Sequence, residues 1–316
     1  MSEVQQSAVK KRPASSFLAP RAVLTSARGI ERMNTSRSDR AASRAIAAEP
    51  HILTRTVLSY LLLALTALLA VAPLWQIGML AFQSSAGGGV AGLVNFRQLL
   101  ASTDFLRWLG NSLFVALAVT VVGVFISATA GYALSRFRFF GRLALLGGLL
   151  VTQIFPATML LLPIFLILVQ FKLINTFLGL ILVYLVTVLP FCIWQMKTFY
   201  DRIPETIEEA AAMDGCTPAE IFWRVVVPIS GQGLVVTALF SFAAAWNEYV
   251  VAAILMQDSE MFTLPVGLRL LHTDSMAGEP GLFAAGALFI TLPMLALYLL
   301  LGRFLVARVA DISIRH

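Results

Sequence analysis

The sequence predicts an all-α, polytopic membrane protein with six transmembrane helices, and three observations carry this prediction. Charged residues make up 13% of the 316 residues and hydrophobic ones 59%, whereas a soluble domain has about 25% charged residues. The apolar residues gather in runs of the roughly 20 residues that a spanning helix needs, and basic residues separate these runs. The six runs cover about residues 57–82, 111–135, 143–169, 174–196, 230–256 and 282–306.

Prolines inside several runs do not argue against these helices. Pro156 and Pro190 are examples. In a membrane, neighbouring helices satisfy the carbonyl groups that a proline leaves free, so proline is tolerated there.

The distribution of lysine and arginine predicts that both termini are cytoplasmic. With this orientation, the inside segments hold 19 of these residues and the outside segments hold four. Short loops on the cytoplasmic side carry the excess of positive charge in membrane proteins.

Residues 1–50 differ from the rest of the chain, because they are rich in Arg, Ser and Ala and contain no apolar run. Their composition predicts a disordered cytoplasmic extension. A rival interpretation is that translation begins at Met33. The remaining residues, 51–316, form the predicted six-helix domain, in which residues 198–228 are a long cytoplasmic loop between the fourth and fifth helices.

Several functions are disfavoured by what the sequence lacks. His51, His272 and His316 are far apart, and neither Cys192 nor Cys216 has a neighbour at metal-ligand spacing. We therefore expect no metal site and no bound cofactor. There is no G-x-x-x-x-G-K-[ST] motif, so the chain has no phosphate loop with which to hydrolyse ATP. A membrane enzyme would need a cluster of reactive groups at one depth, and an ion-coupled transporter usually has carboxylates near the midplane. The spans show neither.

The loop between the fourth and fifth runs begins with a predicted short helix. Pro204 suits the first helical position, where an N–H is not needed. Glu205 and Glu208 then fall in the first turn, where the helix dipole favours negative charge. Alanines follow, and they are strong helix formers. Gly215 can adopt the left-handed conformation that ends a helix.

A second short helix is predicted directly after this turn. Thr217 is its cap, Pro218 its first residue and Glu220 the third residue after the cap, which together form a capping box. Pro228 is expected to close the helix. Two short helices with a tight turn make a compact elbow whose small side chains would fit a groove on a partner. Local features leave open the alternative of a plain linker with two amphipathic helices.

The same loop resembles the EAA loop of ABC-importer permeases, whose pattern is E-A-A-x3-G-x9-I-x-L-P. Here Glu209-Ala210-Ala211 is followed by Gly215 and then by V-x-V-P at residues 225–228, with every spacing kept. Other segments resemble sugar-importer permeases of the maltose type, and the shorter of the two permease partners in particular. These segments are residues 132–137 (YALSRF), 175–182 (NTFLGLIL) and 245–249 (AWNEY). The likeness covers about residues 57–306, and the tail after them departs from it.

This resemblance implies the fold of an ABC type I importer permease, a transport subunit rather than an enzyme. ATP and Mg would be bound by two separate P-loop ATPase subunits, while a second permease subunit and an extracytoplasmic solute-binding protein complete the complex. The chain would lie among the lipids of the inner membrane of a bacterium or archaeon. The resemblance assigns ATPase coupling to five residues of the loop, which are Glu209, Ala210, Ala211, Asp214 and Gly215.

The resemblance also implies a cargo, which is a sugar of disaccharide or oligosaccharide size. The alternatives are an ABC permease for a non-sugar solute and an ion-coupled secondary transporter.

Glu248 is the one carboxylate inside a predicted span, and such residues are candidates for function. It lies sixteen residues after Gln232, which is about 24 Å along a helix and therefore near the outer interface. It either lines the substrate pathway or makes a structural bond at the helix end. Asn247 is a candidate hydrogen-bonding group for a sugar, and Trp246 fits an aromatic anchor at the interface.

Overall fold

The apolar runs fold as helices because a helix satisfies its own backbone hydrogen bonds where water is absent. The computed structural model describes residues 56–83, 92–102, 104–154, 157–274 and 280–313, and all regular elements within these ranges are helices. The predictions for residues 1–50 and for Met33 lie outside them. After a first helix, Thr56–Ala81, the elements are α2 Val94–Ser102, α3 Phe105–Arg136, α4 Arg142–Ile154, η1 Ala157–Leu160, α5 Leu161–Gln170, α6 Phe177–Tyr200, α7 Glu205–Met213, α8 Pro218–Glu220, η2 Ile221–Val226, α9 Val227–Ile229, α10 Gly231–Trp246, α11 Val250–Leu255, η3 Ser259–Met261, α12 Leu264–Asp274 and α13 Pro280–Ser313.

The chain divides into two units, Met1–Ala72 and Pro73–His316. In the first unit, residues 56–72 form an apolar helix whose side chains are exposed all round. The second unit contains the packed helices. At its start, Ala81 is fully buried, and the side-chain amide of Asn95 donates to the carbonyl oxygens of Ala81 and Gln83.

Four of the described helices are long and apolar enough to cross a membrane, and a fifth span exists if the bent pair Pro218–Ile229 and Gly231–Trp246 is counted as one. The long helices are Thr56–Ala81, α3, α6 and residues Pro280–Leu300 of α13. The chain is therefore a multi-pass membrane protein. The predicted six runs are compatible with this count, but two of them are interrupted.

The run predicted at 143–169 is not one helix. It forms α4 and α5, with the 3-10 turn η1 before α5. Pro156 stands between α4 and η1 in the sequence. Proline lacks a backbone N–H and disfavours helical geometry at the residue before it. The described chain after it begins with a 3-10 turn rather than an α-helix.

The run predicted at 230–256 is interrupted too. α10 ends at Trp246, and α11 begins at Val250. The polar residues Asn247 and Glu248 lie in the break, and their side chains bond to nearby backbone groups. The helix therefore ends at these residues although the apolar run continues beyond them.

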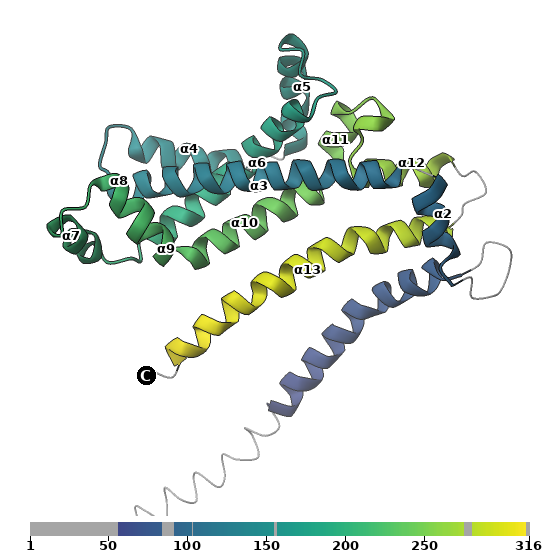
Figure 1. Cartoon of the computed structure of the whole chain (residues 1–316), viewed down its shortest axis with the longest axis horizontal. Helices are drawn as coiled ribbons and strands as arrows, with labels where there is room; N and C mark the ends of the chain where they lie inside the picture. Colours follow the sequence, from purple (N-terminus) through teal and green to yellow (C-terminus); the bar gives the residue numbers. More distant parts are fainter. Residues whose placement is uncertain (1–55, 84–91, 103, 155–156, 275–279, 314–316) are drawn as a thin grey trace, which may run out of the picture. The chain divides into compact units, whose positions relative to one another are not determined.

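α3, α6 and α10 lie side by side in Figure 1 and form the centre of the second unit. The buried face of α3 recurs every three or four residues and is rich in small side chains, as its members Ser112, Val115, Ala116, Val119, Gly123, Ser127, Ala128 and Gly131 show. A Cβ at Gly131 would lie 2.8 Å from the Cβ of Met196 on α6. Small residues of this kind let helix backbones approach closely in membranes.

α3 and α6 run in the same direction, so the bundle has two distinct ends. At the end where α3 and α6 finish, Ser135 bonds to Asp201, and the segment of residues 205–220, here called the elbow, projects from the bundle (Figure 1). At the end where they start, here called the far end, residues 256–264 connect α11 to α12.

Candidate functional site

The first half of the elbow is α7, and its start partly follows the prediction. Glu205 and Glu208 lie in its first turn, as expected. Pro204 does not occupy the first helical position; it is the N-cap, with ψ of 132°. That ψ value is extended rather than helical, and the Pro204 carbonyl accepts a hydrogen bond from the Ile207 amide at 3.3 Å. The proline thus sets the entry into α7 without being part of it.

The turn of the elbow has the predicted left-handed glycine. Gly215 has φ of +88°. Its N–H donates to the Ala212 carbonyl at 3.0 Å, and the Cys216 N–H donates to the Ala211 carbonyl at 3.1 Å. This pair of bonds is the Schellman arrangement, which satisfies carbonyl groups at the end of a helix.

The second half of the elbow starts with the predicted capping box. The Thr217 side chain accepts from the Glu220 amide, and the Glu220 carboxylate accepts from the Thr217 amide at 3.0 Å. The backbone N–H of Thr217, followed by its hydroxyl, lowers the pKa of the Glu220 carboxyl. The Glu220 carboxylate therefore caps α8 most effectively in its charged form.

The helix that was predicted to close at Pro228 ends one residue later, at Ile229. The helical path continues from α8 through a π-helical segment, Ile221–Val226, to Ile229, and Pro228 lies in its last turn. A bend of 77° then separates it from α10. Proline removes one donor from the helical ladder, and the wider π-turn stands directly before it; such turns often mark functional sites.

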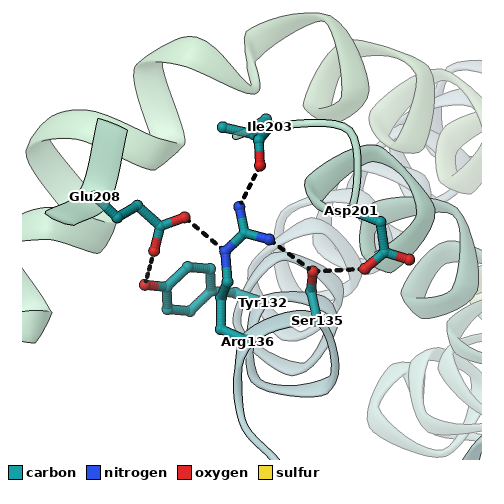
Figure 2. Close-up of polar contacts among 6 residues, drawn as sticks. All are labelled: Tyr132, Ser135, Arg136, Asp201, Ile203 and Glu208. Atoms are coloured by element: carbon teal, nitrogen blue, oxygen red, sulfur yellow. Dashed lines mark hydrogen bonds and ion pairs between the residues drawn. The ribbon is translucent and has the colours of Figure 1, made fainter. Parts of the chain in front are cut away.

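One ion pair attaches α7 to a spanning helix, and Figure 2 shows its surroundings. The Arg136 Nε lies 2.6 Å from Oε1 of Glu208. The Tyr132 hydroxyl donates to the other carboxylate oxygen at 2.7 Å, and a second guanidinium nitrogen donates to the Ile203 carbonyl at 2.9 Å. The Arg136 and Glu208 side chains are only 10% and 13% exposed. Charged groups that are this well paired form strong hydrogen bonds.

A second set of contacts ties the end of α3 to the end of α6. The Ser135 hydroxyl donates to Asp201 at 2.7 Å, and the Lys197 ammonium contacts the other Asp201 oxygen at 2.6 Å. Partial burial alone would raise the pKa of the Asp201 carboxyl, but the bonds from Lys197 and Ser135 together hold it below its usual value. Asp201 therefore remains charged at neutral pH and keeps both contacts.

Beneath the elbow lies an apolar cluster that joins α3, α6 and η2. Its buried members are Ala128, Met196, Tyr200, Ile203, Ile221, Phe222 and Val226. The Tyr132 ring packs on Phe222, with centroids 4.9 Å apart, and on Tyr200 at 5.7 Å. η2 is thus packed firmly on the bundle, whereas α7 has no fully buried residue.

The residues that the resemblance singled out lie on the outer side of this arrangement. Glu209, Ala210, Asp214 and Gly215 are exposed, and Ala211 packs partly against the apolar cluster. Met213, beside the turn, is 89% exposed. The exposed surface of α7 and the turn therefore combines small side chains with two larger apolar ones, Ile207 and Met213, and with acidic residues.

Comparison with known proteins identifies the family of this chain. The sequence profile of the binding-protein-dependent transport system inner membrane component matches residues 123–311, which include the elbow. The chain belongs to this family. It is a permease subunit of an ABC importer, a transport subunit rather than an enzyme, and it works with an ATPase and a solute-binding protein.

Several relatives are similar over most of this permease. The trehalose transport system permease protein SugB of Mycobacterium tuberculosis is 37% identical over 67% of this chain and 78% of the relative. The maltodextrin transport system permease protein MdxG of Bacillus subtilis is 31% identical over 78% of this chain and 91% of the relative. A crystal structure of a bacterial ABC transporter that imports alginate contains a chain with the same fold, with a TM-score of 0.70 and 23% identity, over 78% of this permease and 95% of that chain.

The other candidate residues lie near the far end of the permease, in the break between α10 and α11. The Glu248 carboxylate accepts from the Val251 and Ala252 amides at 2.8 and 3.1 Å and from the Tyr184 hydroxyl at 2.8 Å. These contacts favour the structural alternative for Glu248. The exposed Asn247 side chain donates to the Ala243 carbonyl.

Trp246 is not an interfacial anchor. It is 1% exposed, its indole N–H donates to the Ile290 carbonyl at 3.0 Å, and its ring stacks on Phe242. A bonded indole can be buried inside a bundle as readily as placed at an interface.

The sequence did not predict that Arg136 pairs with Glu208, although both residues lie in segments singled out above. Tyr132 and Arg136 are four residues apart and so lie on one face of α3, and Glu208 lies three residues before Ala211 on the inner face of α7. This spacing was the available signal. Within the described residues, no three His, Cys, Asp or Glu side chains gather where they could hold a metal ion.

Proposed function

We propose that this permease imports a sugar of disaccharide or oligosaccharide size into the cytoplasm by alternating access. Its partners are a second permease subunit, two P-loop ATPase subunits and an extracytoplasmic binding protein. The relatives support the cargo, because their names specify trehalose, maltodextrin and, at 32% identity, the diacetylchitobiose uptake system of Streptomyces coelicolor. ATP and Mg belong to the ATPase subunits, and the permease itself needs no cofactor.

The proposed location is the cytoplasmic membrane of a bacterium or archaeon, among its lipids, with both termini in the cytoplasm. The excess of lysine and arginine on that side, 19 residues against four, supports this orientation. It places the elbow end of α3 and α6 in the cytoplasm, where ATP is available, and the far end outside, where the binding protein delivers its cargo.

The elbow is the proposed contact with the ATPase, and its coupling residues are Glu209, Ala210, Ala211, Asp214 and Gly215. The observation that carries this proposal is the division of α7 into two sides. Glu208 faces inward to Arg136, while Ala210, Ala212 and Met213 are exposed in the described chain. An exposed helix with small side chains, fixed on its inner side to the bundle, can bind in a groove of the ATPase and be displaced by it.

The proposal is tested by uptake of labelled disaccharides into liposomes that contain the complete transporter and internal ATP. We expect uptake that depends on ATP and on the binding protein. Gly215→Pro should abolish uptake while the subunit still inserts, because proline cannot adopt φ of +88° and loses the bond from residue 215 to Ala212. Normal uptake by that variant at normal abundance would contradict the coupling role.

A matched pair of milder variants separates the elbow from general backbone strain. Gly215 and Gly141 have φ of +88° and +86°, and an added Cβ would meet nothing within 4 Å at either. Alanine should therefore cost about the same at both, roughly 1–2 kcal/mol. If the elbow couples to the ATPase, Gly215→Ala lowers uptake more than Gly141→Ala does. Equal effects would contradict a special role for the turn.

A further inference from the structure

α7 is joined to the rest of the permease by few connections, and these differ in character. Its chain neighbours are the short linker of residues 201–204 on one side and the glycine turn on the other. Ala211 adds a partly buried apolar contact. α7 also packs against η2. Its hydrogen-bonded connection to a spanning helix is Glu208, whose partner Arg136 is 72 residues earlier in the chain and ends the longest helix at the centre of the bundle.

Both side chains of this ion pair make further hydrogen bonds. Both Glu208 oxygens are used, one by Arg136 and one by Tyr132. The Arg136 guanidinium also donates to the Ile203 carbonyl in the linker and to the Ser135 hydroxyl. One side chain of α3 thus holds both α7 and the linker that leads to it. Because the pair is largely shielded from water, separating it would leave a buried charge without compensation.

The position of Arg136 decides which helix receives a displacement of α7. α3 packs along its length against α6 and α10. A push on α7 that passed through the linker alone would be absorbed by rotation about its backbone bonds. The ion pair bypasses the linker and acts on α3 directly, while Ser135 and Asp201 tie that same end to α6.

We propose that Arg136 and Glu208 are positioning residues that fix α7 to α3, so that displacement of the elbow by the ATPase moves α3 and α6 together. This inference rests on the proposed coupling function of the elbow and adds the route by which it reaches the spans. Without the pair, the ATPase still closes on ATP, but α7 moves without carrying the bundle with it.

The test uses the complete transporter in liposomes and measures the solute imported per ATP hydrolysed. Arg136→Glu and Glu208→Arg should each lower this ratio by about tenfold or more, because two like charges then meet in a shielded site. The double variant, which restores an opposite pair, should recover most of the wild-type ratio. A structural role alone would lower the amount of assembled transporter and leave the ratio unchanged, and that result would overturn the proposal.

An exposed residue nearby supplies the control. Arg138→Glu makes the same charge reversal as Arg136→Glu at an exposed position of the adjoining turn, outside the elbow, and this variant should keep the wild-type ratio. Charge reversal at the pair could prevent the transporter from accumulating in the membrane. In that case Tyr132→Phe is the test variant, because it removes only the hydroxyl bond to Glu208. It should lower the ratio by about twofold to threefold, and an unchanged ratio would overturn the proposal.

Failure of this inference can be told from failure of the proposed function. A wild-type transporter whose ATP hydrolysis is stimulated by the loaded binding protein, but which imports no sugar, contradicts the cargo. The ratio can then still be measured with the solute that it does carry. If the wild-type transporter imports sugar and the single variants import as much solute per ATP hydrolysed, only the role of the ion pair is contradicted.

Discussion

The elbow and the far end both use polar side chains to organise interrupted helices, but they use them differently. At the far end, side chains from α3 and from Asn175, two residues before α6, bond mainly to the backbone of residues 256–264. Asn111 donates to the Glu260 and Phe262 carbonyls, and Trp108 donates to the Ser259 carbonyl. Asn175 accepts from the Gln257 and Asp258 amides. The path of the connecting chain is thereby fixed at several successive residues.

At the elbow, the backbone of α7 satisfies itself through its own turn, and the long-range bonds come from one side chain, Glu208. Such an element can shift as a unit without breaking its internal bonds. The difference teaches that similar polar residues hold a connecting chain at many backbone groups in one place and attach a self-contained helix through a single side chain in the other. We therefore expect variants at the far end to change stability and variants at the elbow to change coupling.

The largest expected effect is that of Gly179→Ala, near the far end. A Cβ at Gly179 would lie within van der Waals overlap of the Leu173 carbonyl oxygen, and a backbone atom cannot easily move away. The substitution should destabilise the permease by about 3 kcal/mol or more, measured by thermal unfolding of the purified complex. The solute imported per ATP hydrolysed by the protein that remains folded should not change. Gly147→Ala is the control, because nothing lies within 4 Å there. Equal unfolding temperatures for the two variants would contradict the tight contact.

An intermediate effect is expected for Glu248→Gln, and it separates the two interpretations of that residue. If Glu248 is structural, losing a charged acceptor for the Val251 and Ala252 amides should cost about 1.5–3 kcal/mol of stability and leave the KM for the solute unchanged. If it lines the pathway, KM should change while the unfolding temperature does not. Asn247→Ala is the companion variant, since its exposed amide bonds only to the adjacent helical turn, and a changed KM there would support a substrate contact.

The smallest effects come from a pair of capping threonines, one at each end of the bundle. Thr176 accepts from the Gly179 amide at the start of α6, and Thr217 accepts from the Glu220 amide at the start of α8. Alanine at either position should cost about 1 kcal/mol. Hydrogen exchange should show loosening confined to the elbow for Thr217→Ala, but spread over α6 and the far end for Thr176→Ala. Equally local loosening in both would argue against a rigid far end.

The parts of the fold that the sequence predicted are those set by a few neighbouring residues. The glycine turn at 215, the capping box of Thr217 and Glu220, and the acidic first turn of α7 follow from local backbone chemistry and were confirmed. Composition and length were enough to identify the long apolar helices. Similarity to the family's motif located the elbow as the candidate site.

The parts that the sequence did not predict depend on contacts between distant segments. The pairing of Arg136 with Glu208 requires two helix ends to meet, and no local pattern states that they do. The burial of Trp246 depends on the Ile290 carbonyl, 44 residues away. The breaks in the third and fifth apolar runs were not predicted because apolar residues continue on both sides of each. Pro156 in the third run and the polar pair Asn247 and Glu248 in the fifth were the local signs in the sequence.

The close approach at Gly131 limits the kind of motion that α3 can make. Hydrogen is the largest group that fits there, since a Cβ would lie 2.9 Å from the Lys197 amide nitrogen on α6. Turning α3 about its long axis would replace this glycine with Ala130 or Tyr132 and force the two backbones apart. Leaning of α3 and α6 as one block keeps the contact. We therefore expect the spans to tilt rather than to spin when the solute crosses the membrane.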